Sequence, residues 1–145
     1  MHEEEPEIIK DYELEPFLMK VQALSRTFID KLFAVCDYYM NGKPTRNSRH
    51  LYDIYKLKDY LSFDENFMIL VTEVRSHRAQ IDAKVAPSAR ENVEMLAVAK
   101  QLIREEFYEN DYNESTLKLI TDDISYEIVK ENYLKIMKMI FGKSH

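Results

Sequence analysis

A lysine, an arginine, a histidine and an aspartate lie close enough in this chain to form a site for a phosphorylated ligand. Lys31 falls in one segment of apolar periodicity, and Arg49, His50 and Asp53 fall in the next, after a short loop. A lysine binds phosphate as a point charge and an arginine binds it as a planar fork. An aspartate beside them can accept a proton from an attacking hydroxyl or hold the lysine in place. Because helices joined by a short loop pack as antiparallel neighbours, we expect one cationic site between two helices.

Each of these residues also has a structural interpretation. Lys31 flanks an apolar face and can lay its methylene stem along it. Arg49 and Asp53 are four residues apart, a spacing at which a helix-surface ion pair contributes roughly 0.2–0.5 kcal/mol. His50 is equally consistent with a half-buried packing residue. The residue types alone leave both interpretations open.

The elements that position these residues are predicted from apolar spacing, capping residues and helix breakers. A short strand is expected over 14–24, because Pro16 disfavours helix before it and apolar residues alternate after it. Residues 110–120 are expected to be irregular. Helices are expected over about 25–40, 49–61, 63–82, 89–109 and 122–141. The fold class is therefore mainly α, an approximately five-helix bundle with a short N-terminal strand.

Capping residues set several of these boundaries. Ser62 with Glu65 and Ser88 with Glu91 have capping-box spacing, and Thr121 precedes the last helix. The last helix is predicted to bury one apolar face, made of Tyr126, Val129, Tyr133, Ile136, Met137 and Ile140.

The composition indicates one folded domain and excludes several kinds of site. The chain has 145 residues, of which 46% are hydrophobic and 32% are charged. Its single cysteine, Cys36, excludes a disulfide framework and a cysteine-rich zinc site. Its two glycines cannot build a P-loop or a GxGxxG loop. We divide it into an acidic, frayed segment at 1–13 and a helical domain at 14–145.

The charge is unevenly distributed. The formal net charge is −6, which argues against a generally basic nucleic-acid-binding protein. Residues 43–58 nevertheless hold five lysines and arginines against Asp53 alone. This segment suits a polyanion such as a nucleotide or an RNA end, or else it is a solvated loop and helix face. With an acidic N-terminus and no apolar run of membrane-spanning length, the chain is expected to be soluble and cytoplasmic, with no membrane partner.

Two motifs resemble the C-terminal motifs of the AbiEii/AbiGii-type nucleotidyltransferase toxin family. The family's Thr-Phe-x-x-Lys helix start matches Thr27, Phe28 and Lys31. Its Arg-(His/Asp)-x-Tyr-Asp-(Leu/Ile)-Tyr helix start matches residues 49–55. The stretches 12–17 and 135–141 resemble the strand before these motifs and the family's last helix.

The resemblance implies transfer of a nucleotide from an NTP to an acceptor, which in some relatives is the 3′ end of tRNA. Lys31 would contact the triphosphate, Asp53 would be the essential acidic residue and a proton acceptor, and Arg49 would be a charge-stabilising neighbour. His50 and Arg46 complete the candidate nucleotide-binding residues. Mg²⁺ and an NTP are expected for the complete family fold, and a co-encoded antitoxin is the implied partner in an abortive-infection or toxin–antitoxin system.

The chain departs from the family in the half that binds metal. That half needs a Gly-Ser or Gly-Gly turn and an Asp-x-Asp strand, but Gly42 and Gly142 are each followed by lysine and no Asp-x-Asp occurs. Asp122-Asp123-Ile124 is interpreted as a helix start, and the acidic run at 3–5 as a solvated tail. We therefore expect no metal ligands of its own.

Three functions follow from this departure. The first, which we favour, is the C-terminal portion of a truncated nucleotidyltransferase, inactive without its missing N-terminal half. The second is a helical binding module for an antitoxin, a partner subunit or an RNA end. The third is a helical domain without retained activity.

Overall fold

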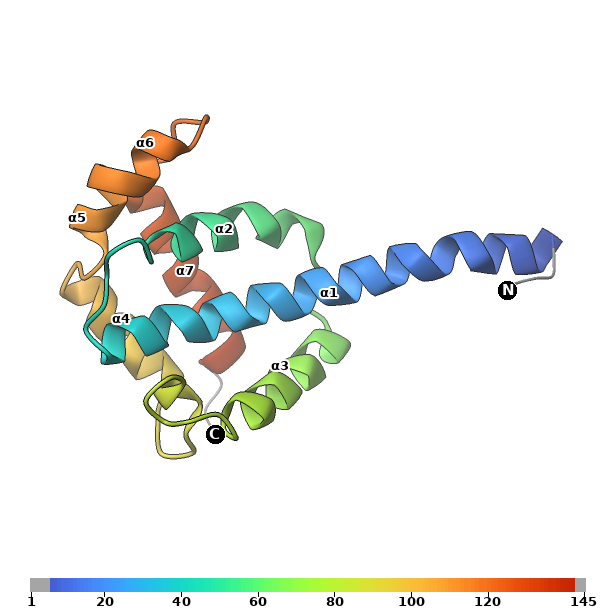
Figure 1. The fold of residues 1–145 in the computed structure, drawn as a ribbon, viewed down its shortest axis with the longest axis horizontal. Coiled ribbons are helices and arrows are strands. Elements are labelled where there is room, and N and C mark those ends of the chain that lie inside the picture. Colours follow the sequence, from blue (N-terminus) through green and yellow to red (C-terminus); the bar gives the residue numbers. More distant parts are fainter. Residues whose placement is uncertain (1–5, 143–145) are drawn as a thin grey trace.

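The computed structural model describes the backbone of residues 6–142 and the side chains of Lys20 and of residues 22–142. It is mainly helical (Figure 1), and no strand occurs in the described backbone, so the mainly α prediction is confirmed. The helices are α1 (Pro6–Met40), α2 (Arg49–Leu57), α3 (Glu65–Arg78), α4 (Met95–Arg104), α5 (Glu109–Asp111), α6 (Leu117–Leu119) and α7 (Tyr126–Phe141). The 3₁₀ turns η1 (Lys58–Tyr60) and η2 (Pro87–Ala89) and the π-helical turn η3 (Tyr112–Thr116) connect them.

The long helix α1 is the axis of the molecule. Its 35 residues span about 50 Å at 1.5 Å per residue. In Figure 1, α2 and α3 flank the C-terminal half of α1 on opposite sides, and its N-terminal turns extend beyond them. α7 packs against α2 and α4 and closes the bundle. The site residues on α1 and α2 are thereby held on one flank of the axis.

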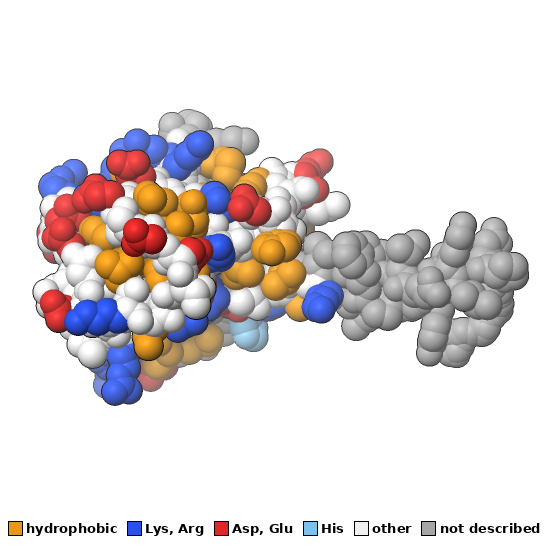
Figure 2. All heavy atoms as spheres, turned by 90° about the horizontal axis from the view of Figure 1, so that it is seen from above, with side chains coloured by type: hydrophobic (Ala, Val, Ile, Leu, Met, Phe, Trp, Pro, Cys, Tyr) orange, Lys and Arg blue, Asp and Glu red, His pale blue; other side chains and the backbone are white. Residues whose placement is uncertain are grey.

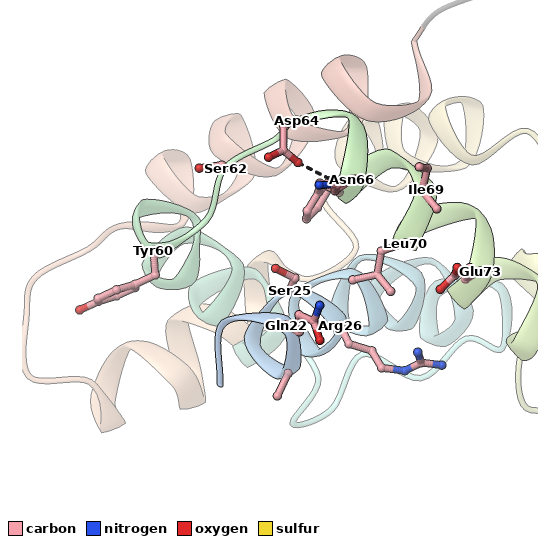
Figure 3. Close-up of a pocket in the computed structure, with 12 residues that line it drawn as sticks. Gln22, Ser25, Arg26, Tyr60, Ser62, Asp64, Asn66, Ile69, Leu70 and Glu73 are labelled. Carbon is pink, nitrogen blue, oxygen red and sulfur yellow. Dashed lines mark hydrogen bonds between the residues drawn. The ribbon is translucent and has the colours of Figure 1, made fainter. Parts of the chain in front are cut away.

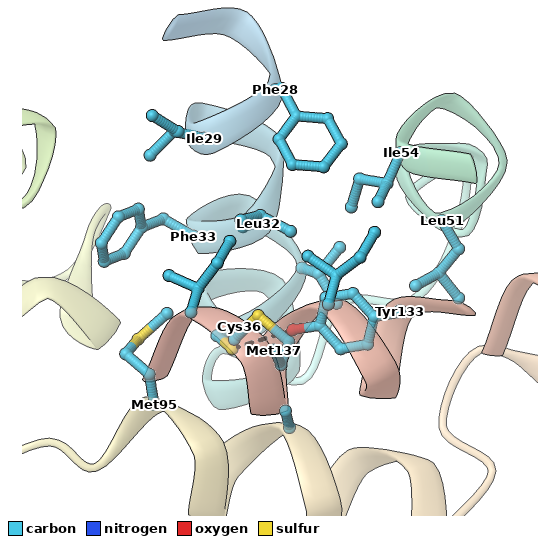
Figure 4. Close-up of a cluster of buried hydrophobic side chains, with 14 of the residues drawn as sticks. Phe28, Ile29, Leu32, Phe33, Cys36, Leu51, Ile54, Met95, Tyr133 and Met137 are labelled. Atoms are coloured by element: carbon cyan, nitrogen blue, oxygen red, sulfur yellow. Dashed lines mark hydrogen bonds between the residues drawn. The ribbon is translucent and has the colours of Figure 1, made fainter. Parts of the chain in front are cut away.

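The core is made where α1, α2 and α7 meet (Figure 4). All six residues predicted for the buried face of α7 are buried. The Cys36 Sγ lies 3.2 Å from the Tyr133 hydroxyl, and burial raises the pKa of the Cys36 thiol to about 12. The cysteine is therefore a packed, protonated core residue.

The predicted strand at 14–24 is wrong, because the backbone there is an uninterrupted part of α1. The apolar residues of this stretch fit a helical period as well as an alternating one, since they include Leu14, Phe17, Leu18 and Val21. Pro16 removes one helical N–H, which a long helix continuous with a well-packed segment tolerates. Of the predicted acidic segment, 1–5 lie outside the described residues and 6–13 form the first turns of α1.

The predicted helix over 89–109 is also wrong in its first part, since α4 begins only at Met95. Ser88 is not its cap: the Ser88 N–H donates to Asp37 at 2.8 Å, and its hydroxyl donates to the carbonyl of Phe33 at 3.3 Å. The Arg75 guanidinium donates hydrogen bonds to three carbonyl oxygens in the segment after Ser88, those of Ala89, Arg90 and Val93. A distant arginine therefore overrides the local capping signal.

Two further caps differ from the prediction. α3 begins at Glu65 and is capped by Asp64, which accepts from the Phe67 N–H at 2.9 Å, rather than by Ser62. α7 begins at Tyr126 and is capped by Ser125 rather than by Thr121. Residues 110–120, expected to be irregular, instead form the consecutive helical turns α5, η3 and α6. Each predicted helix has a counterpart in the structure, but where its first turn begins is set by whichever oxygen meets the free N–H groups.

Candidate functional site

The site is built around an ion pair between α1 and α2. The Lys31 Nζ lies 3.1 Å from the Asp53 Oδ2, and the two side chains are only 22% and 25% exposed. This contact joins the two motifs of the sequence across the helix–helix seam. The predicted juxtaposition of these two residues is therefore present in the structure.

A second cation approaches the same carboxylate from α2 itself. The Arg49 Nε lies 3.9 Å from the Asp53 Oδ1, at the i, i+4 spacing, and the arginine side chain is 54% exposed. Two positive charges thus surround one negative charge, which leaves one positive charge in excess. Because Arg49 is held at the edge of ion-pair distance, its guanidinium remains free to take a second anion.

His50 lies beside this pair and is half-buried. Its ring stacks on Tyr38 with centroids 5.8 Å apart, and its Nδ1 is buried with no hydrogen-bond partner among the described residues. Burial, and then the positive charge of Lys31, lowers the pKa of His50, while Asp53 raises it to a smaller extent. The imidazole is therefore held neutral next to the two charged residues.

His50 gives the fold a pH dependence of definite sign. The ordinary histidine pKa is 6.5 and the native value is lower, so in acid the unfolded chain binds a proton before the native one does. We expect stability to decrease as the pH falls below 6.5, with a slope of at most about 1.4 kcal/mol per pH unit from this residue.

Urea unfolding at pH values on both sides of that point measures this slope. A His50→Phe variant keeps the stack on Tyr38 and removes the titrating group, so its slope is expected to be smaller than that of the parent chain. Equal slopes in the two chains would contradict the assignment.

The start of α2 is fixed by a residue from the distant α5. Asp111 accepts hydrogen bonds from the Ser48 hydroxyl at 2.6 Å and from the backbone N–H groups of Ser48 and Arg46. Ser48 is buried, and Arg46 adopts a left-handed φ of 68°. The Arg46 side chain is exposed, and it is not among the described ion-pair partners of Asp53, which are Lys31 and Arg49. Arg46 is therefore on the rim of the site rather than in it.

A second anchor, Asp122, holds the exposed face of α2 and was not among the predicted site residues. It accepts from the Tyr52 hydroxyl at 2.6 Å and pairs with the Lys56 Nζ at 2.8 Å. Hydrogen bonding to Lys56, and then to Tyr52, lowers the pKa of Asp122. Asp122 was interpreted as a helix start, but it lies in the loop before α7. The sequence signal for this anchor was the Tyr52-x-x-x-Lys56 spacing, which places two hydrogen-bond donors on one face of α2.

The carboxylates near Lys31 do not fit a Mg²⁺ site. Among the described side chains, Asp53 alone pairs with Lys31, and it is already shared with Arg49. A group of three carboxylates, Glu106, Glu109 and Glu127, does place oxygens within 4.8 Å of one another. Lys130 offsets one of the three negative charges of that group, at 2.8 Å from Glu106 and 3.3 Å from Glu127. We therefore assign no metal step to these residues.

A cleft of about 830 Å³ lies on the other flank of α1, between α1 and α3 (Figure 3). Neither Lys31 nor Asp53 lines it. The predicted cationic residues thus form a surface site at the α1–α2 seam, separate from this cleft.

The fold and site together define a class: a helical domain that joins a lysine and an arginine to one carboxylate across a helix–helix seam. None of the helices in the described residues has both the length and the apolar character that a membrane span requires. The family described as "Nucleotidyl transferase AbiEii toxin, Type IV TA system" matches residues 1–145. This chain therefore belongs to the AbiEii nucleotidyl transferase toxin family, a membership that implies a co-encoded antitoxin. No curated protein and no solved structure matches it.

Proposed function

We propose that this chain is the phosphate-binding helical part of a nucleotidyltransferase toxin, in which Lys31 and Arg49 hold the triphosphate of an NTP. The observation that carries the proposal is the 3.1 Å pair between Lys31 and Asp53, which joins two separate family motifs at one point. Family membership supports nucleotide transfer as the reaction class. The 3′ end of tRNA is the proposed acceptor, and the cytoplasm, where both substrates occur, is the proposed site of action.

The residues have distinct proposed roles. The Arg49 guanidinium is exposed and oriented by Asp53, so it binds phosphate oxygens as a planar fork. The Lys31 ammonium binds a phosphate as a point charge, and Asp53 fixes the position of that ammonium. When a phosphate neutralises Lys31, the Asp53 carboxylate is freed from its ion pair and accepts a proton from the attacking hydroxyl. The neutral His50 and the exposed Arg46 border the bound nucleotide.

We further propose that this chain alone transfers no nucleotide. Nucleotidyl transfer depends on neutralisation of the developing phosphate charge by metal ions. The sequence contains no Asp-x-Asp, and the carboxylate at the site is already shared by two cations. The metal-binding carboxylates of the reaction would then come from a polypeptide segment other than these residues.

The experiment separates binding from transfer. We expect the chain to bind a labelled NTP weakly, and Lys31→Met to weaken that binding by roughly tenfold or more, because a hydrogen bond to a charged group contributes about 1.5–3 kcal/mol. Lys118→Met, which removes an exposed lysine of α6, is the matched control and should leave binding unchanged. Incubation with NTP, Mg²⁺ and tRNA should give no labelled product. Turnover that is lost in Asp53→Ala would refute the claim of inactivity, and equal binding by both lysine variants would refute the site.

The alternative function is a binding module for an antitoxin, a partner subunit or an RNA end. It is favoured by the exposure of Lys43, Arg46 and Arg49 on the α1–α2 loop and the first turn of α2. Against it, the surface seen from the side of α2 and α6 mixes acidic, basic and apolar side chains rather than presenting a continuous basic field (Figure 2). RNA binding through these residues would weaken steeply as the salt concentration rises, which distinguishes it from an apolar protein interface.

A further inference from the structure

Three carboxylates from two separate parts of the chain meet beside α5. Glu106 lies in the segment between α4 and α5, Glu109 is the first residue of α5, and Glu127 lies in the first turn of α7. One oxygen of each carboxylate lies within 4.8 Å of the others. In Figure 1, α5 lies at the opposite end of the molecule from the N-terminal turns of α1. Negative charges held this close repel one another, so a positive charge between them would stabilise this part of the fold.

Lys130 supplies one positive charge and leaves a remainder. Its Nζ lies 2.8 Å from Glu106 Oε2 and 3.3 Å from Glu127 Oε2, and its side chain is 16% exposed. Glu109 forms no ion pair within the described part of the chain. Three carboxylates and one ammonium therefore leave two negative charges uncompensated in this group.

The charged neighbours of the group do not supply the missing positive charge. Arg104 and Glu105, which precede it in the chain, both form hydrogen bonds with Gln101. Asp111 is bound to the start of α2, and Glu131 is a further negative residue, exposed on α7. Including these residues in the count therefore makes the region more negative, not less.

Two polar atoms at the group are buried and lack a hydrogen-bond partner among the described residues. They are Glu106 Oε1, the oxygen that Lys130 does not use, and the hydroxyl of Tyr126, a residue only 3% exposed. Burial, and then Glu106, raises the pKa of Tyr126, and the charges of Glu109 and Glu127 raise it further. The Lys130 Nζ also lies over the Tyr126 ring, 5.5 Å from its centroid. The Tyr126 hydroxyl is therefore directed at the carboxylate group, where buried polar atoms without partners point to a bound ion or water.

We propose that Glu106, Glu109 and Glu127 bind a divalent cation of the size of Ca²⁺, with the Tyr126 hydroxyl directed at its ligand shell. Ca²⁺ takes six to eight oxygen ligands at about 2.3–2.6 Å, so oxygens on opposite sides of it are about 4.6–5.2 Å apart. The three carboxylate oxygens fit within that span as they stand. Water completes the ligand shell, and the Tyr126 hydroxyl can form a hydrogen bond with one such water.

The cation would fasten the segment before α5 to the first turn of α7. Its ligands include neither Lys31 nor Asp53, and no step of nucleotide transfer passes through it. The cation site and the proposed nucleotide site therefore stand or fall separately. Lys130 is an internal competitor in this arrangement, because its ammonium repels a metal ion that binds the same carboxylates.

Isothermal titration of the full chain with CaCl₂ tests the proposal. We expect a single saturable site with a Kd of roughly 10⁻⁴–10⁻³ M, the range of weak calcium sites. Ca²⁺ should also raise the Tm, and a chelator should reverse the rise, because the ion binds the native state only. Mg²⁺ should bind more weakly, since it requires a smaller octahedral shell and loses water reluctantly. No saturable binding up to about 10 mM Ca²⁺, or equal binding of Mg²⁺, would overturn the proposal.

Variants of equal charge locate the site. Glu109→Gln and Glu127→Gln should each weaken Ca²⁺ binding by roughly tenfold or more, because each removes a charged ligand. Glu131→Gln removes one exposed carboxylate outside the group and should bind Ca²⁺ like the parent chain. An equal loss in all three variants would show general attraction to an acidic surface and would refute the site.

The competitor gives the test an effect in the opposite direction. Lys130→Met keeps the apolar stem and removes the ammonium, so we expect it to tighten Ca²⁺ binding by roughly threefold or more. Circular dichroism verifies that each variant keeps its helical fold. A folded Lys130→Met variant that binds Ca²⁺ no more tightly than the parent chain would contradict the assignment.

Discussion

Replacing Asp37 with alanine is expected to destabilise the fold by about 3–5 kcal/mol, since it removes one partner of a buried ion pair. The Asp37 Oδ2 lies 2.6 Å from Arg78 Nη2, and the two side chains are 3% and 16% exposed. Asp37 also accepts from the N–H of the buried Ser88 at 2.8 Å. Its loss leaves the largely buried Arg78 guanidinium with only the more exposed Asp30 as an anionic partner among the described residues, and it leaves the buried Ser88 N–H without its acceptor. Chemical unfolding followed by far-ultraviolet circular dichroism measures the loss.

The neighbouring Asp30 provides a matched control. It pairs with the same arginine, at 3.2 Å from Arg78 Nη1, but its side chain is 44% exposed. Exposed ion pairs contribute about 0–1 kcal/mol, so Asp30→Ala should cost no more than that. If the two alanine variants lost the same stability, burial would not be what makes Asp37 important.

Replacing Phe28 with alanine is expected to cost a similar amount, about 3–5 kcal/mol, by leaving a cavity in the core. Phe28 is fully buried and packs against Phe63 and Phe67, with ring centroids 5.6 and 6.0 Å away. It thereby ties α1 to the start of α3, one turn before Lys31. The free energy of unfolding of Phe28→Ala, compared with the parent chain, tests this prediction.

Met139→Ala serves as the comparison, because Met139 is a large apolar residue on α7 that is 45% exposed. A surface substitution of this kind usually changes stability by at most about 0.5 kcal/mol. A loss above about 2 kcal/mol for Met139→Ala, or below it for Phe28→Ala, would contradict the burial argument.

The sequence predicts most strongly what depends on periodicity. The buried face of α7 was predicted residue by residue, and Lys31 and Asp53 were placed together across the α1–α2 seam. Both follow from apolar spacing within one helix and a short connection between two. The resemblance to the family rests on these same residues, and the family match supports it.

The sequence fails where a distant residue decides the local structure. The fourth predicted helix loses residues 89–94 because Arg75 donates hydrogen bonds to the carbonyls of Ala89, Arg90 and Val93. Asp122 was expected to begin the last helix. It instead lies in the loop before that helix and accepts hydrogen bonds from Tyr52 and Lys56, which are 70 and 66 residues away. No local pattern specifies such partners, because nothing in a window of neighbouring residues distinguishes a carboxylate that caps its own helix from one that reaches another.

The two anchors of α2 have a consequence for a toxin during its synthesis. Asp111 and Asp122 lie 63 and 66 residues beyond the α2 groups that they hold, Ser48 and Lys56. While that later segment is still inside the ribosome, the nascent helix has neither anchor, and closing such long loops is slow relative to local helix formation. Arg49 and Asp53 therefore acquire their final orientation only after Asp111 and Asp122 have left the ribosome, so the proposed nucleotide site forms later than α2 itself.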